Sequence, residues 1–77
     1  MTLYFFDVTD TGVTLVDDEG TEAADLSAAR REAFTTLGAI AKDELPDGDR
    51  REFVIVIRDG DGPRMRALLS LRVERLR

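Results

Sequence analysis

The chain of 77 residues contains no cysteine and no histidine. Without cysteine it has no disulfide, no thiolate metal site and no cysteine nucleophile. Without histidine it lacks the commonest general base, the commonest metal ligand and the usual switch near neutral pH. These two absences remove most familiar catalytic centres. We therefore expect a protein that is not an enzyme and that uses neither a metal ion nor a cofactor.

Long apolar runs are also missing. No stretch approaches the roughly 20 apolar residues that a membrane-spanning helix needs. The opening MTLYFFDVTD has neither the basic start nor the long apolar centre of a secretory signal. We therefore expect a cytoplasmic protein without a membrane segment. The composition, 43% apolar and 35% charged, is ordinary for a folded protein, and the length suits one domain, residues 1–77.

Basic residues are absent from positions 1–25, whereas residues 64–77 are rich in arginine and contain a single acid. Charged regions of opposite sign can pair within a chain or between chains, although exposed charge runs are usually solvated. The net charge of −5 argues against bulk attraction to nucleic acid or to anionic membranes. The acids are Asp7, Asp10, Asp17, Asp18, Glu19, Glu22 and Asp25, and the arginines are Arg64, Arg66, Arg72, Arg75 and Arg77.

The first half of the chain predicts a hairpin followed by a helix. Residues 3–8 (LYFFDV) are rich in aromatic and branched side chains, and residues 13–16 (VTLV) alternate in polarity, with turn residues between them. Residues 26–45 have apolar side chains at helical spacing. Asp25 suits the N-cap, and Pro46 and Gly48 end the helix. We interpret Gly38, inside this helix, as a point where a neighbouring element approaches closely.

The second half predicts another hairpin. Residues 52–57 (EFVIVI) form the clearest strand pattern, and residues 58–63 (RDGDGP) are a glycine-rich reversal. Residues 65–73 alternate in polarity and favour a strand, with a helix as the alternative.

The predicted fold is α+β, ββαββ, with one four-stranded antiparallel sheet and a single helix packed on one face. Alternate residues of a strand point to opposite faces of its sheet. We assign to the helix side Leu3, Phe5, Val13, Leu15, Phe53, Ile55, Ile57, Leu69, Leu71 and Val73. The other face then carries Tyr4, Phe6, Val8, Val16, Val54, Val56 and Leu68.

That second face is too apolar to remain in water, because monomers rarely expose large contiguous apolar patches. The simplest cover is a second copy of the same chain. We therefore expect a homodimer whose interface is formed by Tyr4, Phe6, Val54, Val56 and Leu68.

The acidic residues 17–19 (DDE) are either a metal site, an active site or the polar approach to the helix. A calcium loop of the EF-hand type has an acid five residues before its central glycine. The residue at that position is leucine or isoleucine for each candidate glycine, so the spacing fails. We favour the helix approach, where acids meet the positive end of the helix dipole. A looser oxygen-ligand site for a divalent ion, at Asp17, Asp18 and Glu19 or at Asp59 and Asp61, stays open, and the first would make the protein a divalent-ion sensor.

Arg30 falls within the apolar stripe of the predicted helix. We expect its aliphatic stem to lie along apolar surface, or its guanidinium to pair with Asp17, Asp18 or Glu22. An anion-binding role is the alternative.

Several short motifs follow one another in a fixed order: YFF, DDEGTEAADLSAARREA, AIAKDELPDGDRREF, RDGDG and LSLRVERL. In this order and spacing, from about Tyr4 to Leu76, the chain resembles the small bacterial family catalogued as domain of unknown function 6894. The resemblance implies a small stand-alone bacterial protein. It brings no established activity, cofactor or catalytic residue.

The sequence thus predicts a non-enzymatic, self-associating interaction module that acts as an accessory or regulatory protein. The alternative is a nucleic-acid-binding protein whose last strand places Arg64, Arg66 and Arg72 on phosphates. Such binding would weaken steeply with salt.

Overall fold

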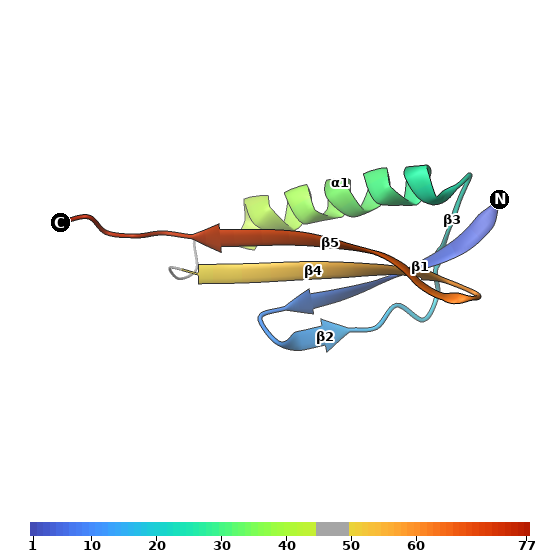
Figure 1. Cartoon of the computed structure of the whole chain (residues 1–77), viewed down its shortest axis with the longest axis horizontal. Helices are drawn as coiled ribbons and strands as arrows, with labels where there is room; N and C mark the ends of the chain where they lie inside the picture. Colours follow the sequence, from blue (N-terminus) through green and yellow to red (C-terminus); the bar gives the residue numbers. More distant parts are fainter. Residues whose placement is uncertain (45–49) are drawn as a thin grey trace.

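The computed structural model of the protein describes residues 1–44 and 50–77. All strand pairs are antiparallel, and the sheet has the order β2-β1-β4-β5, with β3 paired to β1 off this path. In Figure 1 the helix runs along the sheet on the side of β5, away from β2, and it packs on β4, β5 and β3. The fold is α+β as predicted, but it has a fifth strand and the order βββαββ. The elements are β1 (Thr2–Asp10), β2 (Val13–Leu15), β3 (Thr21–Ala23), α1 (Leu26–Glu44), β4 (Arg50–Asp59) and β5 (Gly62–Arg72).

The additional strand is β3, which lies where we expected only a polar approach to the helix. Its sequence, TEA, has little strand propensity. It forms by pairing Thr21 with Tyr4 on the first half of β1. The register of β2, with Val8 opposite Leu15, would place Glu19 opposite Tyr4 if it continued. Two extra residues therefore bulge out of the chain between β2 and β3.

The helix begins as the sequence predicts. The Asp25 carboxylate accepts a hydrogen bond from the N–H of Ala28 at 2.8 Å, which satisfies one of the free donors of the first turn. Ala29, Ala33 and Leu37 recur every four residues and are buried against the sheet. The two alanines have short side chains, so the helix axis lies close to the strands. The predicted helix end at Pro46 and Gly48 lies outside the described residues.

The core lies between α1 and the middle of the sheet. Phe53, Ile55 and Ile57 of β4 are its largest fully buried side chains, and Ala67 of β5 packs beside them. Leu69 and Leu71 are partly buried against this cluster, as predicted. The last segment is a strand and not a helix, since β5 pairs with β4 along its length.

The predicted faces of β1 are wrong. Phe6 lies opposite Ile57 and Val8 opposite Ile55, so both share the helix side with the core. Tyr4 is only 5% exposed there. In LYFFDV one set of alternate residues is Leu3, Phe5 and Asp7 and the other is Tyr4, Phe6 and Val8, so Asp7 is the only residue of this short pattern that distinguishes the faces. Val73, which we also placed on the helix side, lies beyond β5 and is 69% exposed.

The outer side of α1 faces away from the sheet. Gly38 is exposed, and a methyl group added there would have no neighbouring side chain within 4 Å. Our expectation that Gly38 permits a close approach is therefore wrong. Within residues 1–44 and 50–77, no helix has the length and apolarity needed to cross a membrane.

Candidate functional site

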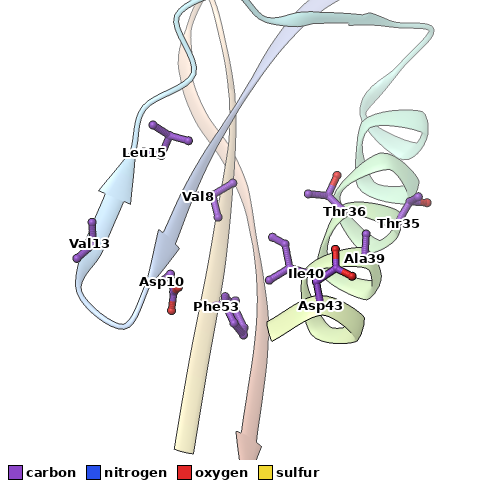
Figure 2. Close-up of a pocket in the computed structure, with 10 residues that line it drawn as sticks. All are labelled: Val8, Asp10, Val13, Leu15, Thr35, Thr36, Ala39, Ile40, Asp43 and Phe53. Atoms are coloured by element: carbon purple, nitrogen blue, oxygen red, sulfur yellow. The ribbon is translucent and has the colours of Figure 1, made fainter. Parts of the chain in front are cut away.

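An apolar groove with a volume of about 770 Å³ lies between α1 and the β1–β2 hairpin. In Figure 2, side chains of the helix form one wall, side chains of the hairpin form the other, and Phe53 lies between them. Val13 and Leu15 of the hairpin wall are each 74% exposed. The groove is lined by Val8, Asp10, Val13, Leu15, Thr35, Thr36, Ala39, Ile40, Asp43 and Phe53.

The groove exists because one helix is too narrow for this sheet. Four strands are roughly 14 Å wide between the outer strand axes, at about 4.8 Å per spacing, whereas a helix with its side chains is about 10 Å wide. The helix packs on β4, β5 and β3. Figure 1 shows the β1–β2 hairpin outside the area that α1 covers. The helix-facing side chains of this hairpin are therefore left in contact with water.

Two carboxylates lie at one end of the groove. Asp10 is the last residue of β1, and Asp43 lies in the last turn of α1. The carboxylate of Asp10 forms an ion pair with the guanidinium of Arg51 at 2.8 Å. The carboxylate of Asp43 is exposed and makes no hydrogen bond or ion pair within the part of the chain that the structure describes. A second, smaller hollow adjoins the groove along Val8 and Leu15 and carries further acids, Asp18 and Glu19. The groove thus combines an apolar interior with acidic surroundings.

The opposite face of the sheet is open and mixed in character. Val54 lies opposite Leu68 and next to Thr9, while Val56 lies opposite Arg66 and next to Asp7. Leu68 is 59% exposed, whereas Val54 and Val56 are half-buried. Three of the five predicted interface residues, Val54, Val56 and Leu68, therefore share this face.

The other two predicted interface residues, Tyr4 and Phe6, are on the helix side. The open face is consequently less apolar than we predicted. The residues of β1 that it carries include Asp7 and Thr9. The sequence contains a signal for this, because Asp7 and Thr9 lie at two-residue spacing from Phe5 and so share its face, whereas Val8 shares the face of Phe6.

The acidic loop after β2 has a structural role in this fold. Both carboxylate oxygens of Asp17 accept backbone hydrogen bonds, from Phe6 at 3.1 Å, from Glu19 at 3.1 Å and from Gly20 at 3.0 Å. Gly20 has a φ of 79°, a left-handed conformation that glycine adopts readily. These bonds fold the two-residue bulge onto the edge of β1.

A salt bridge on the open face supports the same loop. Arg58 donates to Asp7 at 2.7 Å and to the backbone carbonyl of Asp17 at 2.7 Å. Asp7 also accepts the N–H of Asp17 at 2.9 Å. The guanidinium of Arg58 lies 4.4 Å from the centre of the Phe5 ring, a cation–π distance. The cluster joins β1, β4 and the bulge.

The pKa shifts of this cluster keep its groups charged. The hydrogen bond from Arg58 lowers the pKa of Asp7, and Asp7 in turn raises the pKa of Arg58. The N–H groups of Gly20 and then Phe6 lower the pKa of Asp17. None of these shifts moves a group toward neutrality, where a general acid or base works best. The cluster is suited to holding the loop in place.

The arrangement also bears on the divalent-ion hypothesis. The oxygens of Asp17 are already occupied by backbone donors. Asp18 and Glu19 are exposed. Among the residues that the structure describes, no three groups of the types that bind metals gather into a cluster that could hold an ion.

The three arginines proposed for phosphate contacts do not form one basic stripe. Arg64 pairs with Asp59 at 2.7 Å and with Asp61 at 3.2 Å, and Asp59 raises its pKa. Arg72 pairs with Glu74 at 3.1 Å. Arg66 is exposed and has no ion pair within residues 1–44 and 50–77.

Arg30 is not in the apolar stripe of the helix. It is exposed, and its guanidinium lies 4.8 Å from the centre of the Phe34 ring. Phe34 is itself 48% exposed. Ala29 and Ala33 occupy the buried side at this level, so Arg30 is turned toward water. The expected partners Asp17, Asp18 and Glu22 are not paired with it.

Comparison with known proteins shows the family of the chain. Residues 3–72 match the family model described as Domain of unknown function (DUF6894). Neither the curated proteins nor the solved structures contain a match to the chain.

Proposed function

Since the chain belongs to the DUF6894 family, which carries no assigned activity, we propose a function from the geometry: the protein is a small, non-enzymatic interaction module that self-associates by covering its apolar groove. The partner is a second copy of the chain. The module acts as an accessory or regulatory protein.

The observation that carries this proposal is the exposure of the hairpin wall. Val13 and Leu15 are each 74% exposed, although both lie on the core side of the sheet. Leu15 lies opposite Val8, which packs against the core, and Val13 lies opposite Asp10, whose neighbour on β4 is the buried Phe53. Exposed apolar surface that is rimmed by polar residues is typical of association sites. The exposed residues belong to regular strands and not to a loose loop. Such a surface is ready to bind without prior rearrangement, which lowers the entropic penalty of association.

Sedimentation velocity tests the proposal. We expect the wild-type chain to show a monomer–dimer equilibrium between about 1 μM and about 1 mM, where association free energies of roughly 8 to 4 kcal/mol are measurable. Leu15→Asp should weaken the dimer at least about tenfold, because a carboxylate loses its hydration at the interface. A chain that stays monomeric at every concentration would contradict the proposal.

The open sheet face provides a matched control and a second mode of self-association. Leu68 is of the same type as Leu15 and is also exposed, but lies on the opposite face. Leu68→Asp should leave the dimer unchanged if the groove is the interface. The reverse result, with Leu15→Asp harmless and Leu68→Asp disruptive, would support an interface on the open face, where Val54, Val56 and Leu68 of the five predicted interface residues lie.

Nucleic-acid binding is the alternative function, and Arg66 is the observation that favours it. This exposed arginine has no ion pair among the described residues, unlike Arg64 and Arg72. Fluorescence anisotropy with a labelled duplex at low salt tests it. Binding that Arg66→Ala reduces and that salt abolishes would support this alternative.

A further inference from the structure

We propose that the groove of each copy is filled by the segment that follows β5 in a second copy, residues 73–77. This inference rests on the proposed self-association and names the part of the partner that would bind. The two surfaces would exchange reciprocally, so each copy would contribute one groove and one segment.

The apolar side chains of the segment are exposed to water. Val73 is 69% exposed and Leu76 is 90% exposed. Figure 1 shows this part of the chain continuing the line of β5 away from the sheet and the helix. The chain therefore carries an uncovered apolar strip and an uncovered apolar groove of a size suited to a short peptide, about 770 Å³.

The charges of the two surfaces are complementary. The segment carries Arg75 and Arg77 on either side of Leu76, and Arg72 stands directly before it. Its single acid, Glu74, is paired with Arg72 at 3.1 Å. The groove is flanked by Asp10 and Asp43. The smaller hollow beside it adds Asp18 and Glu19. The opposite charges of the two ends of the sequence would thus meet between chains, with apolar side chains buried between them.

The position of the acids favours this orientation. In the strand register, Arg72 of β5 lies opposite Arg50 of β4, and Asp10 of β1 lies opposite Phe53 of β4. The strands β5 and β1 therefore end at the same end of the sheet. Asp10 and Asp43 lie at that end of the groove. If two copies meet at the end of the sheet where β1 and β5 end, the basic segment of each copy points at the acidic end of the groove in the other copy. Such an exchange closes on itself as a two-fold dimer and does not continue into a filament.

Binding within the same copy is disfavoured by reach. The groove opens over β1 and β2, at the far side of the sheet from β5, two to three strand spacings or roughly 10–14 Å away. Val73 is one residue beyond Arg72 and extends at most about 3.6 Å from it. The segment would also have to reverse its direction. Val73 and Leu76 could not both enter the groove of their own chain.

A mixing experiment tests this exchange. One variant ends at Arg72 and keeps an intact groove, and the other is the full chain with Leu15→Asp, which keeps an intact segment. The first change removes only residues outside the sheet and the core. Each variant alone should show a dimer weakened at least tenfold in sedimentation velocity. Their equimolar mixture should associate more tightly than either, because one intact contact forms between the two chains.

Substitutions in the full chain keep the test independent of truncation. Leu76→Glu and the double change Arg75→Glu, Arg77→Glu should weaken the dimer as truncation does, and Leu68→Glu on the open face should not. A labelled peptide of residues 71–77, LRVERLR, should bind the truncated chain saturably. Leu15→Asp in that chain should weaken the peptide binding at least tenfold.

The outcomes separate this inference from the proposed function. If Leu15→Asp breaks the dimer but truncation and Leu76→Glu leave it intact, the groove is the interface and the segment does not fill it. If mixing restores nothing, or the peptide does not bind, the exchange is wrong. If none of the groove changes alters association, both proposals fail.

Discussion

The helix-facing side of the sheet has two halves that carry similar side chains in opposite environments. On β4, Phe53, Ile55 and Ile57 are at most 1% exposed. On β2, Val13 and Leu15 are 74% exposed. Both strands alternate in the same way and belong to one antiparallel sheet. The difference between the two halves is the position of α1, which packs on β4 and β5 and leaves the hairpin uncovered.

This comparison separates two properties that an apolar pattern is often taken to imply together. Alternation determines which side of a strand is apolar. Whether the apolar side of a strand is buried depends on whether another element, here the helix, is wide enough to cover it. In the covered half, burial supplies stability to a small protein that has little apolar area to spare. In the uncovered half, the same pattern supplies a surface for association. The following predictions test this division, beginning with the largest expected effect.

The covered half should be highly sensitive to truncation. Ile55→Ala removes a fully buried side chain at the centre of the core. It should lower the free energy of unfolding by about 2–5 kcal/mol. That is a large share of the total stability of a small domain. Urea unfolding followed by circular dichroism measures the loss. A loss below about 1 kcal/mol would contradict the central position of β4.

The joint between the two halves depends on Asp17, which holds the bulge between β2 and β3. Asp17→Ala leaves three backbone N–H groups without their acceptor and should cost about 1–3 kcal/mol at neutral pH. The pKa of Asp17 is lowered in the folded state, so its stabilisation is present above the unfolded pKa, about 3.9. It is lost as pH falls through the folded pKa.

Unfolding at a series of pH values measures this dependence. The difference in stability between the wild type and Asp17→Ala should be constant near neutrality and shrink in acid. Asp18→Ala is the matched control, since Asp18 is exposed and makes no hydrogen bond within the described residues. A difference that persists unchanged below about pH 2 would show that the carboxylate charge is not the cause.

The outer face of the helix should tolerate and even favour a change. Gly38→Ala adds a methyl group that meets no neighbouring side chain within 4 Å. Alanine should raise the free energy of unfolding by up to about 1 kcal/mol, because glycine is the poorer helix former. Gly20→Ala is the opposite control. Its φ is 79°, and its new methyl would lie 2.9 Å from Leu3. An equal gain in the free energy of unfolding for Gly38→Ala and Gly20→Ala would contradict this difference between the two glycine positions.

The uncovered half should contribute least to the stability of the single chain. Leu15→Ser replaces a side chain on a residue that is 74% exposed. At concentrations below dimer dissociation, the free energy of unfolding should change by less than about 0.5 kcal/mol. Thermal unfolding of the dilute chain measures this change. A loss as large as that of Ile55→Ala would mean that the hairpin is packed and that the two halves do not differ.

The prediction of the fold succeeded where a local pattern was sufficient. The α+β class, the N-cap Asp25, the helix and the strand of β4 all follow from neighbouring residues. It failed for β3, whose residues have little strand propensity and pair only because β1 has a free edge there. It also failed for Arg30, because a helical wheel with several small alanines does not define the buried side well.

The candidate site was predicted only in part. The apolar surplus of the sheet was recognised, but was assigned to the wrong face for β1. Val13 and Leu15 were placed correctly on the helix side, yet we expected them to be covered there. No local signal reports that the helix lies over β4 and β5 and not over the hairpin.

By itself, the sequence determined which side-chain chemistry is available to this protein and where the helix and most of the strands lie. The absence of histidine and cysteine, the alternation of the strands, the helical period and the separation of acids from arginines are all properties of neighbouring residues. The tertiary structure alone decided the existence of β3 and the position of the groove. These features depend on strand register and on the width of one helix, which are set by contacts between residues distant in the chain.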